Sequence, residues 1–223
     1  MTSSTAHRAI APDAKFHCRY ETVVSDICAW PWARLSRDEL TGAAWAYYYF
    51  SIQFRENLET ARRLHPADPQ LLELDQGERN TDNLSPWPGV AKAGEKMHHD
   101  EFMRRALTLD DIPVAKRAHY EMLGQTYLAK VRALDDQSKT LSISSYEDGG
   151  LEQLFKAMLT APHWDTPLLK AFQHFLSEHI RFDSDPDAGH GALCRHLPPD
   201  DRVLPLWQAL QTIFAAAVPG LNR

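Results

Sequence analysis

The chain of 223 residues lacks the features that mark several large classes of protein. It contains no run of about 18 apolar residues, so we expect no membrane-spanning helix. Its first residues, MTSSTAHRAIAPDAK, lack the pattern of a secretory signal, and we interpret residues 1–19 as a flexible tail. The three cysteines show no metal or redox spacing, which predicts free thiols in a reducing, cytoplasmic compartment. The formal charge of −6, without a basic stripe, argues against nucleic acid as a partner.

Strand patterns are also scarce: apolar and polar residues alternate only briefly, in TLSIS at 140–144. Apolar residues instead recur at helical spacing between proline-rich breaks. The pattern predicts helices over about 20–30, 37–64, 68–83, 91–107, 113–134, 145–160, 166–182, 190–197 and 203–217. Residues 20–223 are therefore expected to form a single-domain, all-α helical bundle, which is long enough to bury its own core.

Eleven histidines are unusual for this length, and one of them lies on an apolar helix face together with an aspartate. His179 follows Phe175 and Leu176 by four and three residues, and Asp183 lies one turn beyond it. A histidine and an aspartate at i and i+4 share a face and can reach one ion. His190 follows in the next loop. Taken alone, a hydrogen-bonded pair within the helix is the simpler interpretation.

A second histidine shows the same placement. His99 is followed at i+3, i+4 and i+7 by Phe102, Met103 and Ala106, so it is expected to face the core. Its neighbour His98 is expected to face solvent. For a lone buried histidine, a structural role is again the simpler interpretation.

Three carboxylates complete the candidate set. We interpret Glu147 as the head of a helix, Glu56 as lying on the apolar side of the long helix, and Asp82 as lying near a helix end. Each has a simpler explanation: an acid in a first helical turn, a salt bridge to Arg63 or Arg55, and a common helix-end residue.

Together these residues point to a carboxylate-bridged dinuclear site of iron or manganese. Buried charges need partners, and two divalent cations would neutralise four carboxylates. Nitrogen and oxygen donors without thiolate suit iron or manganese better than structural zinc. The Glu-x-x-His pairs of ferritin-like bundles are not placed suitably here. Only Glu95 and His98 have that spacing, and the histidine is expected to point outward.

The stretch from Phe175 to Asp183, followed by His190 and Gly191, resembles the H-x3-D…H-G signature of haem-oxygenase-like di-iron oxidases and oxygenases. The segment 94–107 is similar to the one that holds the first histidine of that family. Tyr146-Glu147 resembles its mid-chain glutamate. The resemblance covers roughly residues 40–197, is most specific at 175–191, and implies a bundle of the haem-oxygenase-like type.

The resemblance also implies a set of metal ligands, namely Glu56, Asp82, His99, Glu147, His179, Asp183 and His190. In this assignment Glu56, His99 and Glu147 hold one iron, and the remaining four hold or bridge the other. All of these except Asp82 are also the residues expected to support catalysis.

Two departures from the family pattern leave alternatives open. The gap between Asp183 and His190 is longer than usual, so His196 is an alternative ligand to His190. An aspartate at position 82 stands where the family has a glutamate, so Glu78 or Glu95 is an alternative source of that oxygen.

The implied function is that of a non-haem di-iron enzyme. Two Fe(II) ions, or a Mn/Fe pair, would activate O₂ through a peroxo-di-iron intermediate. The substrate would be a small amine- or amino-acid-derived molecule, oxidised by N-oxygenation or C–C cleavage in specialised metabolism. The aromatic residues at 45–50 would wall the pocket. An external electron donor and a second copy of the chain, in a homodimer, are the other partners compatible with this hypothesis.

Two rival hypotheses remain at the level of sequence. One is a metal-free enzyme on the same scaffold, either a thiaminase-like hydrolase that uses Cys194 or a cofactor-maturation oxidase. The other is a non-catalytic helical binding protein, in which the candidate residues form hydrogen-bonded pairs. A haem enzyme would need one axial histidine and would leave the carboxylates unexplained.

Overall fold

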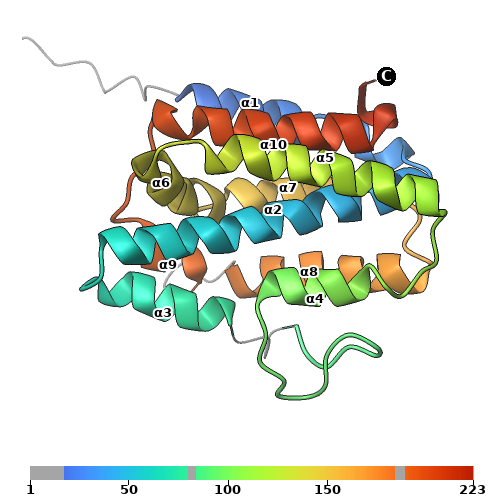
Figure 1. Ribbon diagram of the computed structural model, residues 1–223, viewed down its shortest axis with the longest axis horizontal. Helices are drawn as coiled ribbons and strands as arrows, with labels where there is room; N and C mark the ends of the chain where they lie inside the picture. The colour runs from blue at the N-terminus through green and yellow to red at the C-terminus, as the bar shows by residue number, and fades with distance from the viewer. Residues whose placement is uncertain (1–17, 80–83, 184–188, 223) are drawn as a thin grey trace, which may run out of the picture.

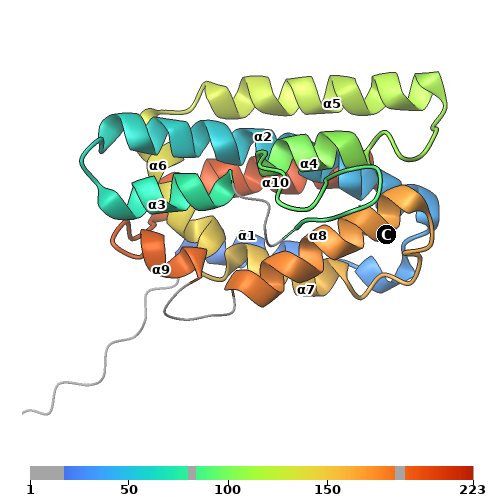
Figure 2. The ribbon, with the colours of Figure 1, turned by 90° about the horizontal axis from the view of Figure 1, so that it is seen from below.

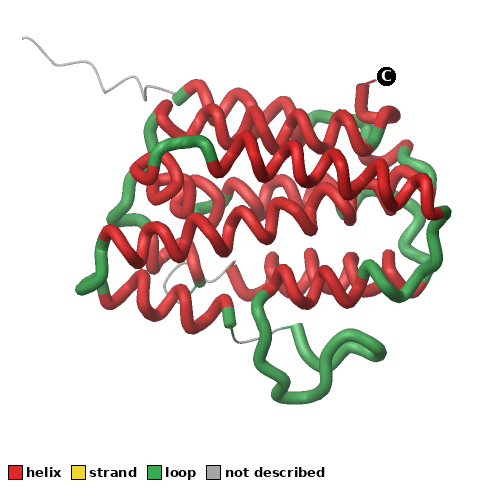
Figure 3. The backbone as a smooth tube through the Cα atoms, viewed as in Figure 1, coloured by secondary structure: helices red, strands yellow, loops and turns green. Residues whose placement is uncertain are grey.

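The computed structural model describes residues 18–79, 84–183 and 189–222, with Asp183 described by its backbone only. Regular structure in these ranges consists of ten α-helices and short 3₁₀ turns, and Figure 3 shows them joined by loops without a strand. The predicted all-α bundle is therefore confirmed. None of the described helices combines the length and the apolar character needed to span a membrane.

The long helix α2 lies at the centre of the bundle and contacts most of the other helices (Figures 1 and 2). In Figure 1, α1, α5 and α10 lie on one side of it, and α3, α4, α8 and α9 lie on the other. The helices are α1 (Arg19–Cys28), α2 (Arg37–Leu64), α3 (Pro69–Glu78), α4 (His99–Ala106), α5 (Val114–Arg132), α6 (Asp136–Glu147), α7 (Gly150–Met158), α8 (Pro167–Asp183), α9 (His190–Cys194) and α10 (Leu204–Ala217).

The boundaries of α2 follow from local chemistry. Ser36 and Glu39 form a capping box, in which the Ser36 hydroxyl accepts from the Glu39 amide and the Glu39 carboxylate accepts from the Ser36 amide. The helix ends at Leu64, because His65 precedes Pro66 and a residue before proline avoids the helical region. The sequence predicted both ends of this helix.

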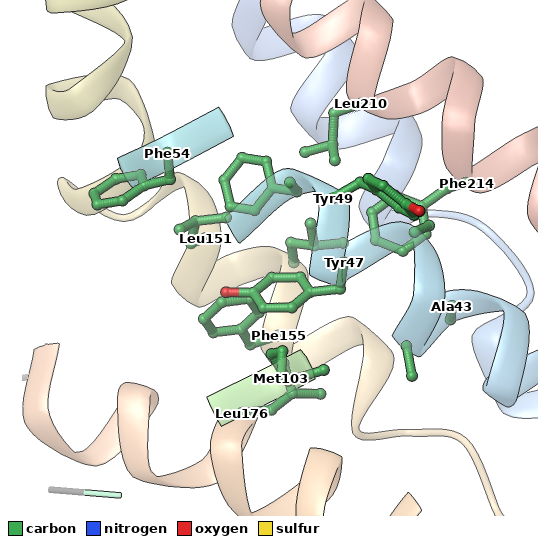
Figure 4. Close-up of a cluster of buried hydrophobic side chains, with 14 of the residues drawn as sticks. Ala43, Tyr47, Tyr49, Phe54, Met103, Leu151, Phe155, Leu176, Leu210 and Phe214 are labelled. Atoms are coloured by element: carbon green, nitrogen blue, oxygen red, sulfur yellow. The ribbon is translucent and has the colours of Figure 1, made fainter. Parts of the chain in front are cut away.

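Aromatic side chains fix α2 against the helices that carry the candidate site. The ring of Tyr47 lies 5.5 Å from that of Phe155 on α7, and 5.6 and 5.4 Å from those of Phe172 and Phe175 on α8. Figure 4 shows Tyr47 beside Phe155, with Met103 of α4 close by. Aromatic contacts of this kind add to the burial of apolar area, so they help to hold α2, α7 and α8 in one arrangement.

The segment 140–144 is helical, although its alternation resembled a strand. It lies within α6, where Asp135 caps the first turn by accepting from the Ser138 amide. The hydroxyls of Thr140 and Ser142 donate to the carbonyls of Asp136 and Lys139 one turn earlier. Such bonds satisfy the hydroxyls inside the helix, so buried serines and threonines are tolerated there.

The expected helix over 145–160 is divided in two. Helix α6 ends at Glu147, and α7 begins at Gly150 after Gly149, whose φ of +96° lies in the left-handed region. Glu147 is therefore the last residue of one helix, and the prediction that it heads the next one was wrong.

The expected helix over 91–107 begins only at His99. Residues 84–98 form a loop that projects from the bundle in Figure 1, with a single β-bridge between Trp87 and Ala91. Gly89 and Gly94 both adopt positive φ, at 77° and 70°, which interrupts any helix in this segment.

Candidate metal centre

Five buried side chains from five helices lie together on one side of α2. They are Glu78 of α3, His99 of α4, Glu147 of α6, His179 of α8 and His190 of α9. Four of them are the first or last residue of their helix, so the ends of four helices converge on α8. Their exposed fractions range from 3% to 9%, and ionisable groups buried to this degree require partners.

Glu78 links two of the histidines. Its Oε2 lies 2.9 Å from Nδ1 of His99, and its Oε1 lies 3.1 Å from Nδ1 of His190. His190 Nδ1 is also 3.4 Å from Oε2 of Glu147, and Nε2 of His179 is 3.1 Å from Nδ1 of His99. The five groups therefore form a continuous chain of polar contacts.

The backbone sets the tautomer of His179. Its Nδ1 lies 2.8 Å from the carbonyl oxygen of Phe175, which can only accept, so Nδ1 carries the proton. Burial, together with the charge of His99, lowers the pKa of His179 to about 3, so the ring is neutral near pH 7. Its Nε2 then carries a lone pair that faces Nδ1 of His99.

The pKa values of the two buried glutamates shift in opposite directions. Burial alone would raise the pKa of Glu78, but His99 and His190 hold it well below its usual range. Burial raises the pKa of Glu147, and the hydrogen bond from His190 offsets this only in part. Although burial opposes it, Glu147 and Glu78 raise the pKa of His190 well above its usual value. The cluster thus holds an ionised glutamate beside a protonated histidine.

A small cavity of about 20 Å³ adjoins the cluster, and His99, Glu147 and His179 contribute to its lining. A space of this size holds about one water molecule. Of the residues 45–50, which were expected to wall a pocket, Tyr47 and Phe50 line this cavity, whereas Trp45, Tyr48 and Tyr49 do not. The same face of α2 continues the wall along the helix, with Ser51, Phe54, Arg55 and Leu58.

Glu56 does not join the cluster. Its two carboxylate oxygens accept from Nη2 and Nε of Arg132 on α5, at 2.6 and 2.8 Å, and its side chain is 28% exposed. Glu56 follows the apolar stripe of Trp45 and Tyr49, and that stripe faces α5 and not the cavity. The assignment of Glu56 as a ligand is corrected on this ground.

Of the three residues considered for the extra carboxylate, Glu78 lies in the cluster. Glu95 is engaged in the projecting loop, where it accepts from the Lys92 amide and pairs with Arg105. Asp82 lies outside the described residues. A signal for Glu78 was present in the sequence, because Leu71, Leu74 and Glu78 share one helix face and all three are buried.

Helices α8 and α9 and the turn after α9 carry the other candidate ligands. His190 lies in the cluster, whereas His196 pairs with Asp68 at 2.6 Å and is 34% exposed. The side chain of Asp183 lies outside the described residues, although its backbone ends α8. His98, which was expected to face solvent, is half-buried and lines the cavity.

Cys194 is poorly suited to act as a nucleophile. It is fully buried, its Sγ donates to the carbonyls of His190 and Gly191, and burial raises the pKa of its thiol far above the usual value. A reactive cysteine needs thiolate character and access. These contacts disfavour the hydrolase that was considered as a rival.

The donor set fits a pair of iron or manganese ions, although the described side chains are paired with one another. Among the described residues, no three such side chains surround one point as they would a bound ion. Two carboxylates and three imidazoles nevertheless supply the donors that these metals prefer. Nε2 of His99 is buried, with no hydrogen-bond partner in the described part of the chain. An unsatisfied buried nitrogen is costly unless something binds it.

Comparisons of the chain with protein-family models, with curated proteins and with solved structures found no match.

Proposed function

We propose that the chain is a non-haem di-iron oxidase or oxygenase that uses O₂ to oxidise a small amine- or amino-acid-derived substrate. The observation that carries this proposal is the convergence of Glu78, His99, Glu147, His179 and His190, buried on five helices, beside an aromatic-walled cavity. When bound, two ferrous ions would supply the electrons that reduce O₂.

The chain's own residues would hold the ions and keep them from water. Glu78 and Glu147 would offset part of the charge, and the three histidines would supply nitrogen donors, with His190 losing its proton on metal binding. The carbonyl of Phe175 fixes the orientation of the His179 ring. Tyr47 and Phe50 close the cavity from the side of α2 and keep its surroundings apolar, which protects reactive species from solvent.

Iron stoichiometry tests the proposal directly. The protein would be titrated with Fe(II) without oxygen, freed of loosely bound metal, and assayed for iron per chain. We expect close to two ions in the wild type. Glu78→Gln and His179→Gln should each lose at least one, because each removes a buried donor. Admitting O₂ to the loaded protein should consume oxygen, measured with an electrode.

Glu56→Gln is the matched control, because it removes a carboxylate from the central helix but leaves the cluster intact. It should keep the iron content of the wild type. Circular dichroism and thermal unfolding of each variant would separate lost ligands from lost fold. Less than one iron per chain at saturation, with the fold intact, would instead favour a structural hydrogen-bonded network.

A further inference from the structure

The cavity beside the candidate centre has a charged side as well as a buried one. Besides the buried donors, its lining includes Arg55 of α2, Asp75 of α3 and Asp100 of α4, which are partly exposed. The side chain of Arg55 is 31% exposed and that of Asp100 is 15% exposed. These residues, with His98, form what we call the mouth of the cavity.

The mouth presents a positive and a negative group from two different helices at close range. Nε of Arg55 lies 3.1 Å from Oδ2 of Asp100, and Nη1 of Arg55 lies 2.8 Å from Oε1 of Glu59. The contact with Glu59 is weak, because that carboxylate is 49% exposed. Within the described part of the chain, the bonds found leave Nη2 of Arg55 and Oδ1 of Asp100 for another partner.

A ligand with one charge would satisfy only one of these groups. A carboxylate at Arg55 would be repelled by Asp100, and an ammonium at Asp100 would be repelled by Arg55. A molecule that carries both groups on adjacent atoms could match both, and the planar guanidinium is well shaped to receive a carboxylate.

We propose that the mouth selects a zwitterionic amino acid, whose carboxylate binds Arg55 and whose ammonium binds Asp100. This inference rests on the proposed function, because it takes the cavity as the route to the reacting centre. The interior has room for about one water-sized group, so the charged head stays at the mouth and only a small part of the side chain can enter the cavity. Long-chain fatty acids, which carry a single charge, are not matched by this mouth.

Binding of matched analogues tests the proposal. A panel of the common L-amino acids would be screened by calorimetry against the protein, both as isolated and loaded with Fe(II) under nitrogen. The tightest binder would then be compared with the amine that lacks its carboxylate and the acid that lacks its ammonium. We expect the amino acid to bind about ten-fold more tightly than either analogue, because it forms two charge-assisted contacts instead of one.

Two variants assign the contacts. Arg55→Gln should weaken binding of the amino acid and of the acid about ten-fold and leave the amine unaffected. Asp100→Asn should weaken binding of the amino acid and of the amine about ten-fold and leave the acid unaffected. Arg55→Lys should keep part of the preference for a carboxylate. Arg63→Gln is the control, because Arg63 lies on the same helix in an exposed pair with Asp136. It should bind as the wild type does.

The outcomes separate this proposal from the one on which it rests. Two irons per chain, with analogues that bind as tightly as the amino acid or with no amino acid bound, would overturn the selection of a zwitterion and leave the metal centre standing. Suppose instead that the chain takes up no iron, but that amino-acid binding is weakened by Arg55→Gln and Asp100→Asn. That result would overturn the metal centre and leave the selection of a zwitterion standing. An equal loss in Arg63→Gln would also overturn the assignment of the mouth.

Discussion

Gly124 allows α5 to approach α2 at Tyr49. A Cβ at position 124 would lie 2.1 Å from Cδ2 and Cε2 of the tyrosine ring, which is far inside van der Waals contact. Alanine would gain about 1 kcal/mol in helix propensity. Overpacking a buried contact costs about 1–3 kcal/mol, and this overlap belongs at the upper end. We expect Gly124→Ala to lower the free energy of unfolding by about 1–2 kcal/mol, measured by urea denaturation.

A substitution of Tyr49 tests the same contact. Tyr49→Leu removes the ring atoms that the new methyl group would meet, so Gly124→Ala should cost less in the Tyr49→Leu background. The coupling should be at least about 0.5 kcal/mol, in the direction of rescue. Strict additivity in the double mutant would show that the overlap is relieved elsewhere.

The candidate ligands show what single residues reveal before a fold is known. His99 and His179 lie at spacings that place them among apolar neighbours, and both are buried in the structure. Glu56 occupies a similar position in its helix, but Arg132 of another helix holds it at the surface. Helical spacing gives the direction of a side chain relative to its own helix, whereas the partner helix decides whether that direction is buried.

At the scale of the element, the start of α3 is tied to the turn that follows α9. Asp68 caps α3 by accepting from the amides of Gln70 and Leu71, and its other oxygen lies 2.6 Å from Nε2 of His196. Asp68→Ala should lower the free energy of unfolding by about 1 kcal/mol, the usual contribution of such a cap. It should also speed amide hydrogen exchange in α3 and reduce iron affinity, because α3 and α9 carry Glu78 and His190.

Ser36→Ala is the matched control for this prediction. Ser36 caps α2, so its loss should lower the free energy of unfolding by a similar amount in urea denaturation. It should leave hydrogen exchange in α3 and iron affinity unchanged. Asp68→Asn should keep much of the cap, since asparagine is an equally good capping residue, but should lose the charge that faces His196. If Ser36→Ala lowered iron affinity as much as Asp68→Ala does, the effect would be one of general stability.

Helices were predictable where caps and prolines mark their ends, as in α2 and α8. The predictions were wrong where the deciding feature is a backbone angle or a buried hydroxyl. Gly149 divides the segment 145–160, and the serines and threonines of α6 are satisfied by the helix itself. The position of Glu147 at the end of α6 depends on that division. The candidate centre therefore combines donors visible in the sequence with an arrangement that the sequence alone could not supply.

At the scale of the whole molecule, buried tyrosines join the helices and limit stability at high pH. Tyr146 of α6 accepts from Gln53 Nε2 on α2 at 3.0 Å, and Tyr127 of α5 donates to Oε1 of the same Gln53. Burial raises the pKa of both tyrosines, and it raises that of Tyr49 to about 12. All three phenols therefore remain protonated in the folded state at pH values where those of the unfolded chain ionise.

The sign of the resulting pH dependence follows from linkage. Between the unfolded pKa of about 10 and the folded values, the unfolded chain has released protons that the folded chain retains. Ionisation then favours unfolding, so the contribution of these tyrosines to stability is fully present below pH 10. It is lost progressively as the pH rises through 12. Urea denaturation at a series of pH values should show the free energy of unfolding falling above about pH 10.

Substitution separates this effect from general alkaline damage. Tyr49→Phe removes one of the ionising groups while keeping the ring, so its unfolding free energy should fall less steeply above pH 10 than that of the wild type. Spectrophotometric titration near 295 nm should show the buried phenols ionising together with unfolding, after the more exposed tyrosines. A wild-type curve that is flat to pH 12, or equal slopes for the two proteins, would show that these phenols ionise without opening the bundle.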